Sequence, residues 1–302
     1  MPRLSRKQII AIILKKKGLL STAFSGRGKA NPLRSAFSGS QVGIHQAISE
    51  SRVHRFLRAY MKTAPVEKVV KNSHQGSTES WIVKLKGGQT ALFKAGPSAF
   101  NEHLAYNVDR IMGFNRIPAV VTRSVKVPRV AASKQGILMQ WIKSSSTGSA
   151  LPVDSRQAVR MRQEFHELRL FDYIIGNNDR HLGNVLVSKR RDRKLIPIDQ
   201  AYSFSWGNLS TIGAVTENTV RGLSLESKIS FLPRLDRLIR KEKYLKDISV
   251  QELPIWTAAY SEPGAITATE YADAINVVMR RARILRQHIS DAIALGEWQP
   301  AY

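Results

Sequence analysis

The chain of 302 residues contains no cysteine. This absence excludes disulfide bonds and thiolate metal sites, and it favours a reducing, intracellular compartment. The sequence also has no run of about 18 apolar residues, so we expect no membrane-spanning helix. Near the amino terminus, the apolar run Ile9–Leu14 is followed at once by Lys15–Lys17. A secretory signal has small residues at that point, so we expect no such signal here.

Acidic residues are missing from residues 1–49, a stretch with nine lysines and arginines. A small unit is repeated within it, because Thr22–Gly26 (Thr-Ala-Phe-Ser-Gly) recurs as Ser35–Gly39 (Ser-Ala-Phe-Ser-Gly). We interpret residues 1–64 as a flexible basic arm with one short helix, capped by Ser5 and ending near Gly18. A mitochondrial-type transit peptide has the same composition, as does a tether for nucleic acid or lipid.

Negative charge is scarce in the whole chain, which has 47 lysines and arginines, 23 aspartates and glutamates, and a formal net charge of +24. This excess predicts anionic partners, among them an acidic protein substrate, anionic lipid or nucleic acid. The alternative is that lysine and arginine only coat the surface. Apolar residues make up 43% of the chain, which is enough for a substantial core and excludes disorder throughout.

Residues 65–150 combine short β-type segments with turn residues, which is typical of a β-rich lobe. Gly87-Gly88 predicts a two-residue hairpin loop between two of the strands. A helix is expected from about Phe100 to Met112, ending at Gly113. Residues 144–148 are expected to form a connector. The expected strands are 66–72, 79–86, 89–95, 119–127 and 137–142.

Residues 151–302 have mostly helical periodicity, with apolar residues recurring three and four positions apart. Two short strands, 185–187 and 195–198, are expected to form a hairpin. The sequence therefore predicts an α+β protein with a β-rich lobe over residues 65–150 and an α-helical lobe over residues 151–302. The expected helices are 156–175, 225–245 and 270–295.

Three oxygen-bearing side chains stand out in the second lobe. Asp179 and Asn184 are five positions apart, and Asp199 follows the apolar segment Ile196–Ile198. Phosphoryl transfer needs a carboxylate that orients the attacking hydroxyl and oxygen ligands for divalent metal ions, and kinase catalytic loops have this Asp-to-Asn spacing. We therefore predict that Asp179 is catalytic and that Asn184 and Asp199 bind metal. A lone aspartate more often caps a turn, but the three together weaken that alternative.

A cation for nucleotide phosphates is expected from the first lobe. Lys94 ends the third expected strand, where kinases have a lysine that contacts phosphates. Glu102 lies early in the following helix and could hold Lys94 by an ion pair. We assign both residues to cofactor binding. The alternative is an ordinary edge lysine and a glutamate favoured by the helix dipole.

These motifs resemble those of atypical kinases. Asp179-Arg180-His181-x-x-Asn184, followed by Ile198-Asp199, is similar to the signature of the four-jointed and Golgi secretory-pathway kinases, the HipA-type kinases and the phosphoinositide 3/4-kinases. The segment from Glu102 to Pro118 is especially similar to the four-jointed and Golgi branch. The resemblance extends in order over roughly residues 65–295. It implies a two-lobed kinase fold, ATP as phosphoryl donor, and Mg or Mn as metal.

Carried over by position, the resemblance assigns phosphate contact to Lys94 and orientation of that lysine or of a metal to Glu102. It makes Asp179 the catalytic acid and Asn184 and Asp199 the metal ligands. The implied function is ATP-dependent phosphotransfer, with protein serine or threonine as acceptor. A phosphoinositide or sugar kinase and a pseudokinase scaffold that binds anionic partners are the alternatives. Asp199-Gln200-Ala201 departs from the Asp-Asn-Gly of many relatives, which puts loop flexibility or activity in question.

Overall fold

The computed structural model describes residues 54–73, 79–142, 145–147, 155–188, 194–204, 218–248 and 267–297. Contacts divide the chain into Met1–Arg52 and Val53–Tyr302, and every described residue belongs to the second unit. The helix expected between Ser5 and Gly18 and the repeated unit therefore lie outside the described residues. Among the helices that are described, none combines the length and apolar character needed to cross a membrane.

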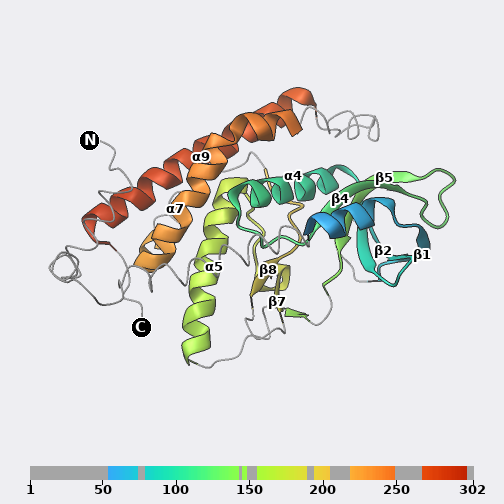
Figure 1. Cartoon of the computed structure of the whole chain (residues 1–302), viewed down its shortest axis with the longest axis horizontal. Coiled ribbons are helices and arrows are strands. Elements are labelled where there is room, and N and C mark those ends of the chain that lie inside the picture. The colour runs from blue at the N-terminus through green and yellow to red at the C-terminus, as the bar shows by residue number, and fades with distance from the viewer. Residues whose placement is uncertain are drawn as a thin grey trace, which may run out of the picture. The chain divides into compact units, whose positions relative to one another are not determined.

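Five antiparallel strands form the sheet of the first lobe, in the order β1-β2-β3-β5-β4 (Figure 1). Gly87 and Gly88 have φ values of 93° and 83°, as the expected hairpin loop between β2 and β3 requires. The register places Lys94 opposite Ile137 and near the end of β3. The strands are β1 (Val66–Lys71), β2 (Ser80–Leu85), β3 (Thr90–Ala95), β4 (Val120–Val125) and β5 (Lys134–Gln140).

The core of this lobe includes part of residues 1–64, the range that the sequence predicts to be a flexible arm. A helix over residues 54–63 precedes β1, and its Met61 packs in the same buried cluster as Val83, Phe93 and Leu138. Ala64 belongs to that cluster as well. The sequence of this helix contains several charged residues and no long apolar segment, so it was not predicted as part of the core. Its packing nevertheless makes it part of the folded lobe.

Helix α4 (Pro97–Met112) packs against the sheet and against the helices of the second lobe (Figure 1). It begins at Pro97, three residues before the expected start, because proline without an amide hydrogen suits the first turn of a helix. It ends as expected at Gly113, whose left-handed φ of 69° lets its amide cap the last carbonyls. Glu102 therefore lies in the second turn of a helix held by both lobes.

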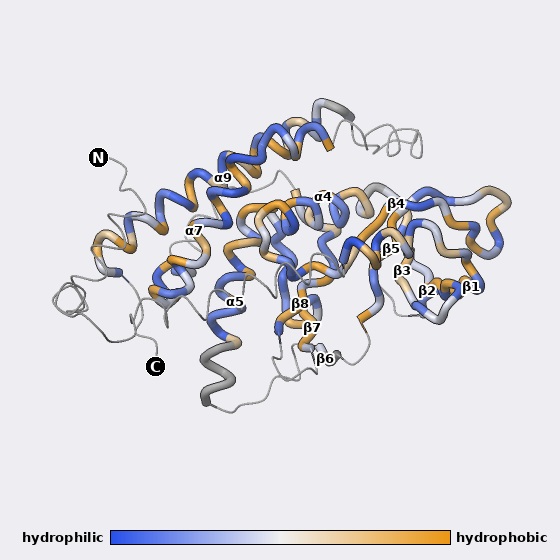
Figure 2. The backbone as a smooth tube through the Cα atoms, in the orientation of Figure 1, coloured by the Kyte–Doolittle hydropathy of each residue, from blue (hydrophilic) through white to orange (hydrophobic). Residues whose placement is uncertain are grey.

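Three long helices, α5 (Ser155–Ile175), α7 (Leu225–Arg240) and α9 (Ala268–Leu295), form most of the second lobe. Helix α7 ends at Arg240, and a separate helical segment covers residues 242–248, so the single expected helix is interrupted. Along α9, hydrophobic and hydrophilic residues alternate around the helix, which suits packing on one face (Figure 2).

A small antiparallel sheet carries the segment that leads to Asp199. It consists of β6 (Ser145–Thr147), β7 (Val185–Ser188) and β8 (Leu195–Pro197), in that order. The expected hairpin of β7 and β8 is confirmed, whereas the expected connector contains β6, which pairs with β7. The three residues of β6 are serine and threonine, so they show no alternation of apolar and polar residues that would predict a strand. Strand β6 forms because it pairs with β7. The two-lobed α+β fold is confirmed.

Candidate active site

Lys94 joins the two lobes through two carboxylates. Its Nζ lies 2.6 Å from Oε1 of Glu102 and 3.0 Å from Oδ1 of Asp199. Glu102 is fully buried and the Lys94 side chain is 9% exposed, whereas Asp199 is 38% exposed. The three residues come from β3, α4 and the segment after β8, so both lobes must be in place for this contact to form.

The charges of this cluster support one another. Burial disfavours the charge on Lys94, but the carboxylates of Glu102 and Asp199 outweigh burial and raise the pKa of Lys94 above its ordinary value. Burial would raise the pKa of Asp199, but the nearby Lys94 charge and its hydrogen bond lower that pKa overall. The ammonium and the Asp199 carboxylate are therefore both ionised at neutral pH, as phosphate and metal binding require.

Asp179 and Asn184 lie together at the start of the small sheet. The Asn184 amide donates to Oδ2 of Asp179 at 3.1 Å and to its carbonyl oxygen at 3.0 Å. The Asp179 amide donates to Oδ1 of Asn177 at 3.0 Å. With its amide hydrogens directed at Asp179, Asn184 is left with its side-chain oxygen as the group that could bind a cation. His181 has a structural contact, since Nδ1 accepts a hydrogen bond from the Gly183 amide.

A backbone contact places these residues beside the segment of Asp199. The Ile198 amide donates to the Asn184 carbonyl at 3.0 Å, and Asp199 is the next residue. The structure thus brings all five predicted site residues into two contacting groups, Lys94 with Glu102 and Asp199, and Asp179 with Asn184. This convergence is what an active site between the lobes requires.

Arg180 holds the two groups together, a role that sequence reasoning missed. Its buried guanidinium contacts both carboxylate oxygens of Asp172 and donates to the carbonyls of Asn184 and Ile198 at 2.7 Å each. It also contacts the side-chain oxygen of Gln200. Five donors in one fixed plane suit arginine to such a junction. The only sequence signal was the position of Arg180 between two predicted site residues.

The departure Asp199-Gln200-Ala201 has a structural role of its own. Gln200 is fully buried, and its oxygen also accepts from the Asn177 amide at 3.0 Å. Asp199 has a φ of 56°, which aspartate tolerates better than most residues, but Ala201 is not among the residues with positive φ. The loop therefore needs no glycine at residue 201. The Ala201 carbonyl accepts from Asn101 of α4 at 2.7 Å, which ties the loop to the first lobe.

The oxygen donors fit a divalent metal that is partly coordinated by phosphates. Within the described residues, no group of three histidines, aspartates or glutamates could hold an ion without other ligands. However, Oε2 of Glu102 is buried without a hydrogen-bond partner, and Asp199 and Asn184 each have an oxygen suited to a hard cation. Magnesium in nucleotide sites is typically held by one or two protein oxygens and by phosphates, which agrees with this set.

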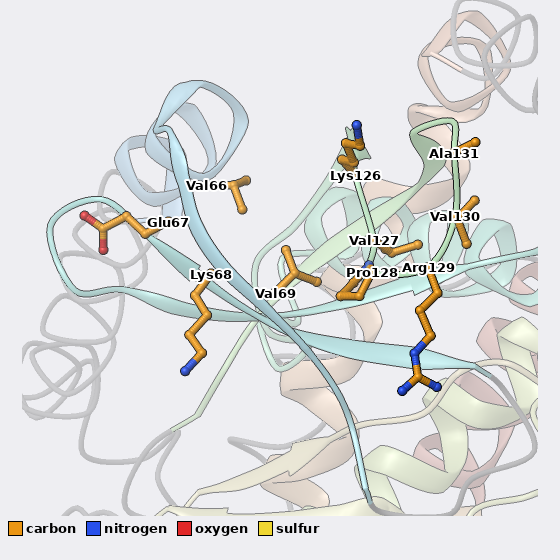
Figure 3. A pocket seen from close by; sticks show the side chains of 10 residues that line it. All are labelled: Val66, Glu67, Lys68, Val69, Lys126, Val127, Pro128, Arg129, Val130 and Ala131. Atoms are coloured by element: carbon orange, nitrogen blue, oxygen red, sulfur yellow. The ribbon is translucent and has the colours of Figure 1, made fainter.

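A groove elsewhere in the first lobe is separate from this chemistry. It is formed by the start of β1 and by the segment after β4, and none of the five predicted site residues lines it. Its lining combines valines with cations, and the head groups of Lys68 and Arg129 project to the same side in Figure 3.

Comparison with solved structures supports the kinase fold. The Golgi casein kinase is similar with a TM-score of 0.53 and 14% sequence identity, covering 81% of this chain and 77% of that one. The Helicobacter pylori proinflammatory kinase CtkA aligns with a TM-score of 0.42 and 10% identity, covering 78% of this chain and 97% of its own, a likeness too weak to carry an argument. No curated protein sequence matches the chain.

The family match covers most of the chain and both predicted motifs. Residues 5–228 match the family described as phosphatidylinositol 3- and 4-kinase. This range contains Lys94 and Glu102 in the first lobe and Asp179, Asn184 and Asp199 in the second. The resemblance drawn from the sequence motifs is confirmed, and the chain belongs to the phosphatidylinositol 3- and 4-kinase family of ATP-dependent kinases.

Proposed function

We propose that the protein transfers the γ-phosphoryl group of ATP to a serine or threonine hydroxyl of a protein. The observation that carries the phosphotransfer is the contact of Lys94 with both Glu102 and Asp199, at 2.6 and 3.0 Å. Active kinases need the lysine–glutamate pair and the metal-binding aspartate in place at the same time. The pair and the aspartate meet here in one cluster.

Each residue of the site has a distinct role in this proposal. Lys94 contacts the ATP phosphates, Glu102 holds its ammonium in place, and Asn184 and Asp199 hold Mg²⁺ or Mn²⁺. A metal ion held there would neutralise negative charge on the phosphate oxygens. Asp179 orients the acceptor hydroxyl and accepts its proton as that oxygen forms a bond to the γ-phosphorus. The bond from the γ-phosphorus to the bridging oxygen breaks, and ADP is the leaving group.

Protein is the proposed acceptor because of the fold that the chain shares with a casein kinase and because of its charge. The similar solved structure is named as a casein kinase of the Golgi. The net charge of +24 would attract an acidic protein substrate electrostatically. The same charge suits anionic lipid, and the acid-free arm over residues 1–49 suits nucleic acid or lipid.

A phosphoinositide headgroup is the second candidate acceptor, and the family match favours it. The matched family is described by its action on phosphatidylinositol. Both candidates use an alcohol oxygen as nucleophile, so the same five residues serve either reaction. A sugar hydroxyl is chemically equivalent, but no observation in this structure favours it.

A radiolabelled ATP assay separates these acceptors. The protein is incubated with Mg²⁺ or Mn²⁺ and with dephosphorylated casein, phosphatidylinositol vesicles or free sugar in parallel, and Asp179→Asn serves as the inactive control. We expect label in casein that Asp179→Asn fails to transfer. Label in the vesicles alone would move the assignment to a lipid kinase. Label in none of them, together with no autophosphorylation, would contradict the proposal.

Metal-dependent nucleotide binding distinguishes a kinase from a scaffold with the same fold. A pseudokinase would bind an anionic partner through its basic surface without turnover. We expect ATP to raise the melting temperature only when Mg²⁺ or Mn²⁺ is present, because Asn184 and Asp199 would hold the ion that ATP needs for tight binding. Binding of nucleic acid alone, with affinity that falls steeply as salt rises, would support the scaffold instead.

A further inference from the structure

The segment between α4 and β4, residues 113–118, lies where the first lobe meets the second. Helix α4 carries Glu102, which contacts Lys94 at 2.6 Å, so a shift of α4 would displace the lysine that we assign to phosphate binding. Because α4 also packs against α7, its position depends on contacts with the second lobe as well as with the sheet. Within residues 113–118, Arg116 makes polar contacts with α5 and with β8 of the second lobe.

This segment is fixed rigidly to the end of α4. The Arg116 amide donates to Oδ1 of Asp109 at 2.9 Å, and the Phe114 amide donates to the Asp109 carbonyl at 3.0 Å. Arg110 donates to Oδ1 of Asn115 at 2.7 Å and also contacts the Ile117 carbonyl. Asp109 is fully buried. The segment and the helix therefore move as one body.

The side chain of Arg116 then reaches into the second lobe. Its guanidinium lies 2.7 Å from Oε2 of Glu164 and 3.6 Å from Oε2 of Glu167, both on α5. Arg234 of α7 contacts the same Glu167 oxygen at 3.2 Å. The Arg116 and Glu164 side chains are 14% and 12% exposed, so water screens this ion pair less than a surface pair.

An aromatic side chain completes the junction. Phe114 stacks on Phe171 of α5, with ring centroids 5.3 Å apart, and lies edge-on to Phe231 of α7 at 6.2 Å. The guanidinium of Arg116 lies 5.2 Å from the centre of the Phe114 ring, and that of Arg234 lies 5.3 Å from it. Arg116 and Arg234 therefore contact the same aromatic ring and the same Glu167 carboxylate.

One oxygen of Glu164 connects the two halves of the active site. Oε2 accepts from Arg116 at 2.7 Å and from the Leu195 amide of β8 at 3.0 Å. Leu195 begins the strand that leads directly to Asp199, while Arg116 is fixed to the helix that carries Glu102. This one oxygen atom therefore contacts both the segment fixed to α4, which carries Glu102, and the strand β8, which leads to Asp199.

We propose that Arg116 and Glu164 are positioning residues that hold Glu102 and Asp199 at the distance needed to clamp Lys94. The ion pair fixes α4 in the position for turnover without contacting the nucleotide itself. The inference rests on the proposed role of Lys94 in phosphate binding. A displacement of reacting groups by about 1 Å can lower a rate by roughly 100-fold, so a remote pair of this kind can matter for activity.

The test compares Arg116→Gln with Arg286→Gln. Arg286 forms an ion pair with Asp236 that joins α7 to α9, so its loss serves as a control that removes an interhelical ion pair away from α4. We expect Arg116→Gln to raise the KM for ATP and lower kcat, together costing roughly tenfold or more in kcat/KM. The Arg286–Asp236 pair is more exposed, at 31% and 36%, so Arg286→Gln should lower the melting temperature less than Arg116→Gln does, and it should leave KM and kcat unchanged.

Further variants keep the test decisive. If Arg116→Gln does not fold, Arg116→Lys and Glu164→Gln each keep one hydrogen bond and should show the same KM and kcat changes in milder form. The double variant Arg116→Gln/Glu164→Gln should be no worse than the more severe single variant, because the pair acts as a unit. Unchanged KM and kcat in folded Arg116 and Glu164 variants, with melting temperatures lowered as in Arg286→Gln, would overturn the proposal.

Lys94→Met separates this inference from the proposed function. If Lys94→Met abolishes ATP affinity while the Arg116 and Glu164 variants keep the KM and kcat of the parent, the function stands and the positioning role is wrong. If Lys94→Met itself binds metal-ATP normally, the assigned nucleotide site is wrong, whatever the Arg116 variants do.

Discussion

Lys94 and Asp199 are 105 positions apart in the sequence, yet Nζ of Lys94 lies 3.0 Å from Oδ1 of Asp199. The contact joins the strand β3 of the first lobe to the segment after β8 of the second. Glu102 lies on the other side of the ammonium at 2.6 Å. This buried lysine joins the two lobes by contacting a carboxylate from each of them, and it is the residue that we propose contacts the ATP phosphates.

We predict that Lys94→Met destabilises the protein as well as abolishing turnover. Glu102 is fully buried, and without Lys94 its carboxylate is left without a compensating charge. Removing one partner of a buried ion pair costs on the order of 3 kcal/mol. The measurement is the free energy of unfolding in urea beside an ATP turnover assay.

The double variant Lys94→Met/Glu102→Gln provides the control for that prediction. It removes the unpaired charge, so most of the lost stability should return while turnover stays absent. Equal destabilisation in the single and the double variant would show that the charge of Glu102 is not what Lys94 compensates.

Gly176 is predicted to tolerate alanine poorly. It has a left-handed φ of 67° at the end of α5, and a methyl group there would collide with Nη1 of Arg281. Arg281 is itself buried, so it cannot move freely into solvent. The backbone strain alone costs about 1–2 kcal/mol, and the collision adds to it. We expect Gly176→Ala to lower both the free energy of unfolding and kcat, because Asp179 follows three residues later.

Gly88 provides the matched comparison for Gly176. Its φ is 83°, but an added methyl group would meet nothing within 4 Å. Gly88→Ala should therefore show the strain alone and leave kcat unchanged. Adding Arg281→Ala to Gly176→Ala should relieve the collision but not the strain. If Gly88→Ala and Gly176→Ala lose the same stability and both keep full kcat, the proposed collision is absent.

The sequence predicted the parts of the site that follow local rules. The spacing of Asp179 and Asn184 is set by one loop. The hairpin of Gly87-Gly88 and the stop at Gly113 depend on positive φ values, which glycine adopts more readily than any other residue. Lys94 and Glu102 were predicted because kinases have a phosphate-contacting lysine at the end of the third strand and a glutamate that pairs with it from the next helix. Those features can be identified within a few residues of sequence.

The contacts that join distant segments were not predicted. Arg116 and Glu164 are 48 positions apart, and nothing in the local pattern of either residue indicates the other. Arg180 lies within a predicted motif, but its role depends on contacts with Asp172 and Gln200, which the motif does not include. Strand β6 likewise depends on pairing with β7 and not on its own residues. Such pairings are decided by tertiary packing, which overrides local propensity.

Lys228 is predicted to make stability rise with pH in the alkaline range. Its side chain is fully buried and donates to the Leu223 carbonyl at 2.8 Å. Burial lowers the pKa of Lys228 from 10.5 to about 8, although Glu297 partly opposes this change. Between these two values the unfolded chain binds more protons than the folded protein, so the free energy of unfolding increases with pH.

Lys228→Met should remove this dependence. At pH 7 the variant is expected to be more stable by up to about 3 kcal/mol, less the value of the lost hydrogen bond, and the gain should shrink between pH 8 and pH 10. Urea unfolding at pH 7, 8 and 9.5 measures the difference, with the exposed Lys241→Met as control. A variant that is less stable than the parent by the same amount at every pH would show that Lys228 is not destabilised by burial.

Asp199→Asn is expected to weaken metal-dependent ATP binding as well as turnover. The carboxylate is proposed to hold the metal on the phosphates, an interaction already present before reaction. The substitution hardly changes volume, and Lys94 keeps its 2.6 Å contact with Glu102, so the protein should still fold. Calorimetry with ATP and either Mg²⁺ or Mn²⁺ measures the affinity. Affinity equal to that of the parent with both metals would show that Asp199 is not a metal ligand.

Asp179→Asn, in contrast, should leave ATP affinity nearly unchanged and lower kcat by roughly 10²–10⁴. Asp179 is proposed to orient the acceptor hydroxyl and accept its proton, which matters mainly in the transition state. In the parent protein the side-chain amide of Asn184 lies 3.1 Å from Oδ2 of Asp179. An asparagine at position 179 can direct its oxygen at the same amide, so the loop should keep its conformation. The measurement is kcat for phosphoryl transfer beside ATP affinity by calorimetry. Full turnover by Asp179→Asn would mean that another group takes the proton and that the assigned catalytic loop is wrong.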